Sequence, residues 1–174
     1  IVANTPDSNT VSACELAIAL LLATARNILP ADRYLKSGKW EREIFVGNEV
    51  CHKTLGIIGL GRIGSLVATR MKAFGMDLIA YDPYISDERF KRYECKKAET
   101  LDELLKVSDF ITIHTPKTSE TLKIISYDQI EKMKDNVRLV NAARGGVFDE
   151  AAVAAGLESG KIASYGFDVH EKEP

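Results

Sequence analysis

The stretch KTLGIIGLGRIG, which runs from Lys53 to Gly64, decides the fold of this 174-residue chain. Its first half, Lys53 to Ile58, is apolar and β-branched, which is typical of a buried strand. Its second half, Gly59 to Gly64, follows the pattern G-x-G-x-x-G. Ser65 to Phe74 is expected to form a helix that Gly75 ends. A strand, a glycine-rich turn and a helix therefore follow one another directly.

Downstream of this stretch, segments typical of strands alternate with segments typical of helices. Further strands are expected at Asp77–Tyr81, Phe110–Ile113, Val137–Val140 and Ile162–Phe167, and further helices at Leu101–Val107 (capped by Thr100), Tyr127–Met133 and Glu150–Leu157. Such alternation implies right-handed crossovers between parallel strands, with helices on both faces of the sheet. The sequence therefore predicts an α/β fold with a doubly wound parallel sheet, similar to the Rossmann fold.

The N-terminal segment has a different character. Ser12 and Glu15 are spaced as a capping box, and the helix that they begin continues through the apolar run Leu16 to Ala23. A helix that is apolar on every side needs burial on every side. We therefore expect the helix over residues 12–28 to pack against a second subunit, as in a homodimer, or against a second domain. The alternative is an ordinary helix in the core of this domain.

Composition excludes several classes of protein. The chain is 45% apolar and 28% charged, and 23 basic residues against 25 acidic ones leave a net charge of −2, which gives no basis for binding nucleic acid or an anionic membrane. The longest apolar run, residues 16–23, is much shorter than the roughly 20 residues that span a bilayer. Cys14, Cys51 and Cys95 form no metal or disulfide pattern, and His52 and His170 have no partners that suggest a metal site. We expect a cytoplasmic domain without a metal.

The glycine pattern predicts a binding loop for the pyrophosphate of a dinucleotide, because it lies between a strand and a helix. Gly59 permits the tight turn, Gly61 lets the backbone approach the phosphates, and Gly64 permits close packing of helix and strand. The backbone amides of Arg62 and Ile63 then point at the phosphates, assisted by the helix dipole. The alternative is a turn with a purely structural role.

Asp82 ends the second strand, 18 residues after Gly64. This is close to the spacing of about 20 residues at which a carboxylate binds the ribose hydroxyls of the adenosine. The same carboxylate repels the additional phosphate of NADP, and Pro83 and Tyr84 offer that phosphate no cation. The sequence therefore favours NAD as the cofactor. The alternative is an aspartate that caps a turn.

Polar residues follow two further strands, where the carboxyl ends of a parallel sheet face the ligand crevice. Thr115, within His114-Thr115-Pro116, is placed to line the cofactor, unless it is merely a solvated strand end. Arg144, within Asn141 to Gly146, can bind a carboxylate through two parallel hydrogen bonds, although a surface salt bridge is the alternative. Asp168 follows the last strand, with Glu171 and Glu173 beyond it, and these acids bind an amide, tune a base, or form a solvated tail.

Together these motifs resemble the nucleotide-binding domain of the D-isomer-specific 2-hydroxyacid dehydrogenases, over essentially the whole chain. The resemblance rests on the order and spacing of five motifs: Gly59 to Gly64, Tyr81-Asp82-Pro83, His114-Thr115-Pro116, Asn141 to Gly146, and Phe167-Asp168-Val169 through Glu173-Pro174. It implies that Arg62 and Ile63 hold the pyrophosphate of NAD and that Asp82 holds the ribose. It also implies that Thr115 and Ala142 line the cofactor.

The resemblance implies roles for three further residues. Asp168 bonds the nicotinamide carboxamide, and Arg144 binds the carboxylate and carbonyl oxygen of a small 2-hydroxy acid. Glu173 pairs with a catalytic histidine and raises the pKa of that histidine toward the working pH. In the family that histidine comes after this point of the chain, and His170 does not replace it.

The resemblance also bears on substrate and domain organisation. Four segments are similar in sequence to family members that act on 3-phosphoglycerate: Asn4-Thr5-Pro6, Gly38 to Arg42, Phe74 to Met76 and Ala143 to Gly146. D-lactate, glyoxylate and hydroxypyruvate are alternative substrates, and a dinucleotide-sensing corepressor without catalysis is an alternative of another class. Because the chain starts at Ile1 and stops at Pro174, we expect residues 1–174 to be one NAD-binding domain of a longer protein, without its flanking substrate domain.

Overall fold

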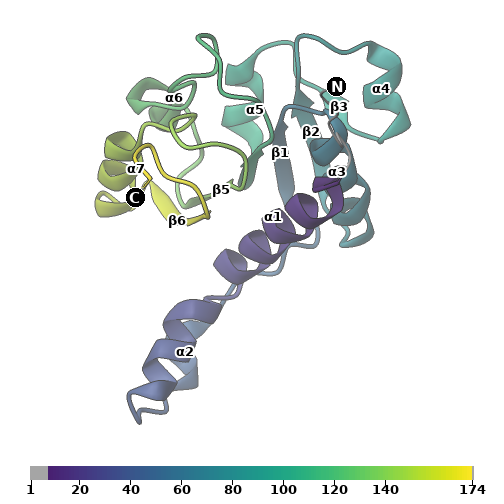
Figure 1. The fold of residues 1–174 in the computed structure, drawn as a ribbon. Helices are drawn as coiled ribbons and strands as arrows, with labels where there is room; N and C mark the ends of the chain where they lie inside the picture. Colours follow the sequence, from purple (N-terminus) through teal and green to yellow (C-terminus); the bar gives the residue numbers. More distant parts are fainter. Residues whose placement is uncertain (1–7, 174) are drawn as a thin grey trace.

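A computed structural model describes residues 8–173 and shows a six-stranded, wholly parallel sheet (Figure 1). The strand order is β3 (Lys96–Lys97), β2 (Asp77–Tyr81), β1 (Thr54–Ile58), β4 (Phe110–Ile113), β5 (Val137–Asn141) and β6 (Ile162–Phe167). This order, 3-2-1-4-5-6, reverses direction between β1 and β4, and such a switch point opens a crevice at the carboxyl ends of the two strands. The predicted doubly wound α/β fold is confirmed.

Helices cover both faces of the sheet, and each face has its own hydrophobic core. On one face lie α1 (Thr10–Ala25) and α3 (Arg62–Ala73), whose fully buried residues include Leu21 and Met71. On the other lie α5 (Leu101–Val107), α6 (Tyr127–Glu131) and α7 (Glu150–Glu158), with Leu104 and Leu105 fully buried. The central strands have near-continuous apolar sequences because both of their faces are buried.

Most of the predicted elements are present with bounds within one or two residues. The bounds of β2, β4, β6 and α5 are those predicted, and the Thr100 side chain accepts a hydrogen bond from Glu103 N (3.3 Å) as the helix cap. The largest shifts are of three residues. α3 starts at Arg62 instead of Ser65 because the extended residue Gly61 is already its N-cap. α1 ends at Ala25 instead of residue 28, because Asn27 adopts a left-handed conformation (φ 52°) between α1 and α2. Four short elements were not predicted: α2 (Ile28–Lys36), the 3-10 turn η1 (Arg42–Phe45), α4 (Asp87–Arg92) and β3.

The predicted capping box at Ser12 and Glu15 is wrong. The N-cap of α1 is Asn9, and the Ser12 hydroxyl donates back to the Asn9 carbonyl (3.0 Å) instead of accepting from the next turn. Only one side of α1 is buried by this domain, because Leu16 remains 39% exposed and Val11 50% exposed. α1 therefore packs in the core of this domain along one side and exposes apolar residues on its other side.

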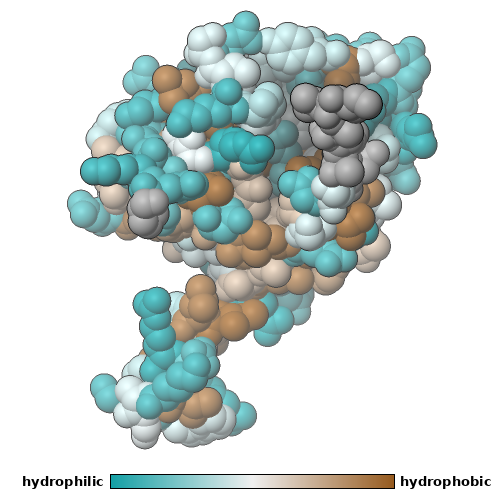
Figure 2. Space-filling view, in the orientation of Figure 1, coloured by the Kyte–Doolittle hydropathy of each residue, from teal (hydrophilic) through white to brown (hydrophobic). Residues whose placement is uncertain are grey.

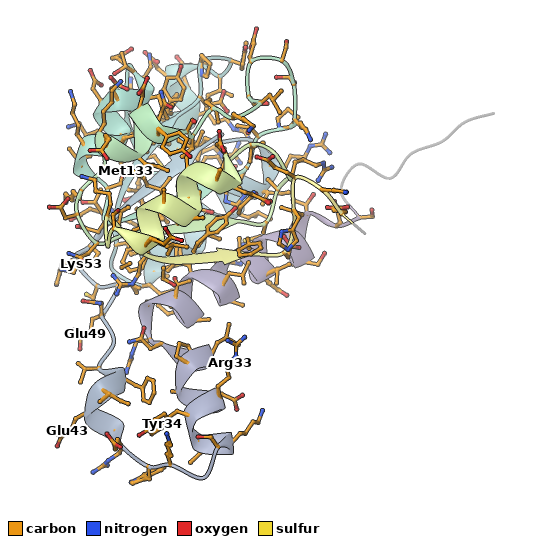
Figure 3. All side chains as sticks on the ribbon, turned by 90° about the vertical axis from the view of Figure 1, so that its left-hand side faces the viewer. Arg33, Tyr34, Glu43, Glu49, Lys53 and Met133 are labelled. Atoms are coloured by element: carbon orange, nitrogen blue, oxygen red, sulfur yellow. The ribbon has the colours of Figure 1, made fainter. Side chains whose placement is uncertain are left out.

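Residues 28–46, which we call the arm, extend away from the body of the domain (Figures 1 and 3). Two hydrogen bonds tie its base together, from Asn27 Nδ2 to Val46 O (3.2 Å) and from Asn48 N to Ala25 O (2.7 Å). Further out, the rings of Tyr34 and Phe45 meet edge to face at 5.3 Å. No single helix among residues 8–173 has the length and apolar character to cross a membrane. α1 and α2 reach that length and apolar character only when they are taken together, and the pair is bent by 65°.

Candidate functional site: a dinucleotide crevice

The glycine-rich loop that joins β1 to α3 packs closely against neighbouring backbone atoms at Gly59 and Gly64. Gly59 has a positive φ of 89°, and a side chain there would meet His114 O at 2.9 Å. A side chain on Gly64 would lie 2.1 Å from Gly59 O. At Gly61, by contrast, a side chain would meet nothing within 4 Å, so this glycine faces open space in front of α3. The three glycines thus occupy the positions that a phosphate-binding turn requires.

Asp82 lies directly after β2 and is tied to this loop. Its Oδ2 accepts a hydrogen bond from Leu60 N (2.9 Å), and its Oδ1 accepts one from Tyr84 N (3.0 Å). Each carboxylate oxygen can accept a further hydrogen bond, so ribose hydroxyls can bind without displacing these donors. The arrangement fixes the carboxylate at the end of β2 and beside the phosphate loop.

A cavity of about 400 Å³ opens beside Asp82. It is lined by the glycine loop, by the segment that follows β2 and by the segment that follows β4, including Gly59, Gly61, Asp82, Thr115, Thr118 and Glu120. Across its mouth the Tyr84 hydroxyl donates a hydrogen bond to Glu120, which raises the pKa of Tyr84. Thr118 and Glu120 were not predicted as site residues, because the loop between β4 and α6 contains no recognisable motif.

A second cavity, of about 390 Å³, continues from the first. The two share His114, Thr115 and Pro116, and the second adds predicted site residues from α3 and from the ends of β5 and β6: Ile63, Ala142, Arg144 and Asp168. Asn9, Ala13 and Leu16, near the start of α1, form its remaining wall. The two cavities make one crevice with Asp82 at one end and Arg144 with Asp168 at the other.

The junction of the two cavities contains polar atoms without partners. Thr115 Oγ1 and His114 Nδ1 are buried and have no hydrogen-bond partner within residues 8–173. The other ring nitrogen of His114, Nε2, lies 3.0 Å from Thr112 Oγ1. Burial lowers the pKa of His114 to about 4, so the imidazole is neutral at physiological pH. A buried hydroxyl without a partner is costly, which favours a ligand that hydrogen-bonds Thr115.

The loop that carries Arg144 is held from two sides. The Asn141 side chain accepts from Ala143 N and donates to Arg144 O, both at 3.1 Å. A side chain on Gly145 would lie 1.6 Å from His170 O, so the loop packs directly on the C-terminal segment. Arg144 itself is exposed, and its Nη1 donates to Ala143 O (2.6 Å), which leaves its other donors for a ligand.

The C-terminal segment is anchored to α7. Glu171 N donates to Glu150 Oε1 (2.6 Å), and Glu150 N donates to Glu171 Oε1 (3.2 Å). His170 lies 3.6 Å from the same Glu150 oxygen and packs edge to face on Phe167, so it is engaged away from the crevice. Glu173 is exposed at the end of the described residues and lines neither cavity. The stretch Asn4-Thr5-Pro6 lies outside the residues that the structure describes.

These features fit NAD. Open space at Gly61 and the amides at the start of the 12-residue helix α3 suit a pyrophosphate. The Asp82 carboxylate suits a ribose, and the unpartnered Thr115 hydroxyl lies between the two halves of the crevice. Arg62 begins α3 and Ile63 lines the second cavity, so both adjoin the phosphate position.

Comparison with known proteins gives one consistent family. The family described as "D-isomer specific 2-hydroxyacid dehydrogenase, NAD binding domain" matches residues 18–174. The D-3-phosphoglycerate dehydrogenase of Archaeoglobus fulgidus is 52% identical over all 174 residues, which make up 33% of that enzyme. The chain therefore spans about a third of the length of this curated relative.

Solved structures of related enzymes have the same fold. A glyoxylate reductase from Paecilomyes thermophila is 36% identical with a TM-score of 0.88, covering 98% of this chain and 51% of its own. A D-lactate dehydrogenase from Aquifex aeolicus, complexed with NAD and lactic acid, is also 36% identical with a TM-score of 0.88, covering 97% of this chain and 50% of its own.

Replacing Gly61 with alanine tests the phosphate position. Because a side chain there meets no atom within 4 Å and φ is −72°, Gly61→Ala should unfold at a temperature close to that of the wild type. It should weaken NADH binding at least about tenfold, since the methyl group occupies the approach of the pyrophosphate. Calorimetric titration of the full-length protein measures this. Gly64→Ala, the matched control, should lose both stability and binding, and unchanged NADH affinity in Gly61→Ala contradicts the assignment.

The buried His114 predicts a pH dependence of stability. Unfolded His114 takes up its proton near pH 6.5, whereas the folded protein resists protonation until about pH 4. The free energy of unfolding should therefore fall as pH drops from 6.5 toward 4, by up to about 3 kcal/mol from this residue. Urea unfolding of wild type and His114→Gln at several pH values isolates the contribution. Parallel pH profiles for the two proteins count against it.

Proposed function

The chain belongs to the D-isomer specific 2-hydroxyacid dehydrogenase family as an NAD-binding domain, and from that premise we propose that the whole protein oxidises 3-phosphoglycerate to 3-phosphohydroxypyruvate. This oxidation is the first step of serine synthesis. The observation that carries the dehydrogenase proposal is the continuous crevice between Asp82 and Arg144, with Thr115 at its midpoint. The identity of 52% to a D-3-phosphoglycerate dehydrogenase, over the full chain, supports the choice of substrate.

Bound NAD supplies the hydride acceptor for C2 of the substrate, and the residues of this chain position the reactants. Asp82 and the loop around Gly61 would hold the adenosine and pyrophosphate, and Asp168 would bond the nicotinamide carboxamide. The guanidinium of Arg144 binds the substrate carboxylate and polarises the oxygen on C2. Lying on the rim of the second cavity, Arg144 is within reach of a small acid there.

Proton transfer requires a group that this chain does not contribute. We assign it to a histidine in the remainder of the protein, with Glu173 as the acid that pairs with it and stabilises its charged form. Glu171, two residues before Glu173, and Glu150 each donate a backbone N–H to the carboxylate of the other, which supports a fixed position for this segment. The remainder of the protein also supplies the substrate domain, which fits the third of the relative's length that this chain covers.

Two alternatives remain distinct from this proposal. D-lactate or glyoxylate chemistry is favoured by the solved structures of a D-lactate dehydrogenase and a glyoxylate reductase, each 36% identical to this chain. A dinucleotide sensor without catalysis is an alternative of another class, but Arg144 at the rim of the second cavity favours an enzyme.

A substrate panel tests the proposal. Full-length protein should oxidise NADH with 3-phosphohydroxypyruvate at a higher kcat/KM than with pyruvate, glyoxylate or hydroxypyruvate. Arg144→Met should lower that kcat/KM by about 100-fold or more while leaving the Kd for NADH unchanged, because it removes two charge-assisted hydrogen bonds to substrate. Lys172→Met, which removes an exposed cation nearby, is the matched control. Preference for an unphosphorylated acid refutes the substrate, and no turnover with any acid favours the sensor.

We also propose that the protein is a homodimer, joined through the arm and through α1, the helix that spans Thr10–Ala25 instead of the predicted residues 12–28. The arm presents large apolar side chains that are each more than half exposed: Ile28, Leu29, Leu35, Trp40, Ile44 and Val46. Figure 2 shows apolar surface where the arm meets the body, and Figure 3 shows the two limbs of the arm carrying Tyr34 and Glu43. Apolar surface gathered on a projecting segment is typical of an interface.

The three free thiols support a cytoplasmic location.

Charges placed on the arm test the dimer. Sedimentation of the full-length protein should give at least the mass of two subunits, and Leu29→Asp combined with Val46→Asp should shift it toward monomer because two charges are then desolvated in the interface. Leu157→Asp on α7, a residue 40% exposed on the body, is the matched control and should leave the mass unchanged. A wild-type monomer, or a double variant with the mass of the wild type, rules out this interface.

A further inference from the structure

The peptide groups of Leu60 are held by two side chains of opposite charge. Its N–H donates to Asp82 Oδ2 at 2.9 Å, and its carbonyl oxygen accepts from Arg89 Nε at 2.8 Å. Leu60 stands between Gly59 and Gly61 and is fully buried. The carboxylate thus faces the positive end of one peptide dipole, and the guanidinium faces the negative end of the next.

Arg89 comes from α4 (Asp87–Arg92), the helix that follows β2 in the chain. Phe90, 2% exposed, anchors this short helix in the hydrophobic core that α1 and α3 also share. The Arg89 guanidinium lies over the Tyr93 ring, 5.7 Å from its centre. Because Arg89 lines neither cavity, any effect on the cofactor passes through the backbone of the loop.

We propose that Arg89 is a positioning residue for the cofactor: it holds the Leu60 carbonyl so that the backbone from Gly61 to Ile63 is preorganised for the pyrophosphate. A loop of glycines loses much conformational freedom when it is ordered, and binding is weaker when the ligand must supply that ordering. With Asp82 and Arg89 on opposite sides of Leu60, the loop is ordered before the ligand arrives. Asp82 also contacts the ribose, whereas Arg89 serves the phosphates alone.

This division makes a specific prediction. Removing the Arg89 hydrogen bond should weaken the binding of ligands that carry a pyrophosphate. It should leave the binding of ligands that carry only adenosine unchanged, because the bond from Leu60 N to Asp82 remains. The inference rests on the binding of NAD at this loop, which the proposed function also requires. A structural defect in α4 would instead lower the affinity for every ligand together.

The experiment compares Arg89→Met with Arg92→Met in the full-length protein. Arg92 belongs to the same helix and lies 5.6 Å from the same Tyr93 ring, but no hydrogen bond joins it to Leu60, so it is the matched control. Calorimetric titration with ADP-ribose and with adenosine gives the affinities, and kinetics with varied NADH at saturating 3-phosphohydroxypyruvate give kcat and the KM for NADH. Thermal unfolding reports the stability of each variant.

For Arg89→Met we expect the Kd for ADP-ribose and the KM for NADH to rise about tenfold, the change typical of losing a hydrogen bond from a charged donor. The Kd for adenosine and the kcat should match the wild type, Arg92→Met should match it throughout, and Arg89→Lys should fall between the wild type and Arg89→Met. Unchanged affinity for ADP-ribose, equal losses for both ligands, or an equal loss in Arg92→Met overturns the inference.

Two outcomes separate this inference from its premises. If Arg89→Met does not fold, Arg89→Lys against Arg92→Lys carries the test, and equal affinities of these two for ADP-ribose overturn the inference. If the wild type itself fails to bind ADP-ribose and NADH, the proposed function fails with it.

Discussion

The contact between the backbones of Gly59 and Gly64 is the constraint on which the rest of the site depends. A single methyl group at Gly64 would lie 2.1 Å from Gly59 O, so α3 begins as close to the end of β1 as two backbones allow. The N-terminus of α3 therefore lies at the switch point between β1 and β4. Asp82 and Thr115 line the same cavity as this turn, and Asp82 accepts a hydrogen bond from Leu60 N within it.

Much of the fold follows from hydrophobic patterns that are local in sequence. β2 and β4 are predictable because strands buried on both faces have continuous apolar sequences between turn residues. The arm is not predictable in this way, since α2 is short and mostly exposed, and its tie at Asn27 to Val46 spans 19 positions. The start of α1 was misassigned because a capping-box spacing at Ser12 does not reveal that the helix begins one turn earlier.

The site is predictable where a motif coincides with the end of a strand. The sequence therefore indicates Gly61, Asp82 and Arg144, whose positions follow from the parallel order of the sheet. It does not indicate Arg89 or Glu120, because each reaches the crevice or its loop from a segment 29 or more positions away from its partner. Nothing in the spacing of charged residues distinguishes such a contact from an ordinary solvated side chain.

Titration of the full-length protein with NADH and with NADPH tests the central claim most directly, that the crevice takes a dinucleotide with its ribose on Asp82. The carboxylate accepts hydrogen bonds from the ribose hydroxyls of NADH and repels the additional phosphate of NADPH. The account predicts that NADH binds at least about tenfold more tightly than NADPH, a difference of about 1.4 kcal/mol. Equal affinities, or tighter binding of NADPH, would contradict it.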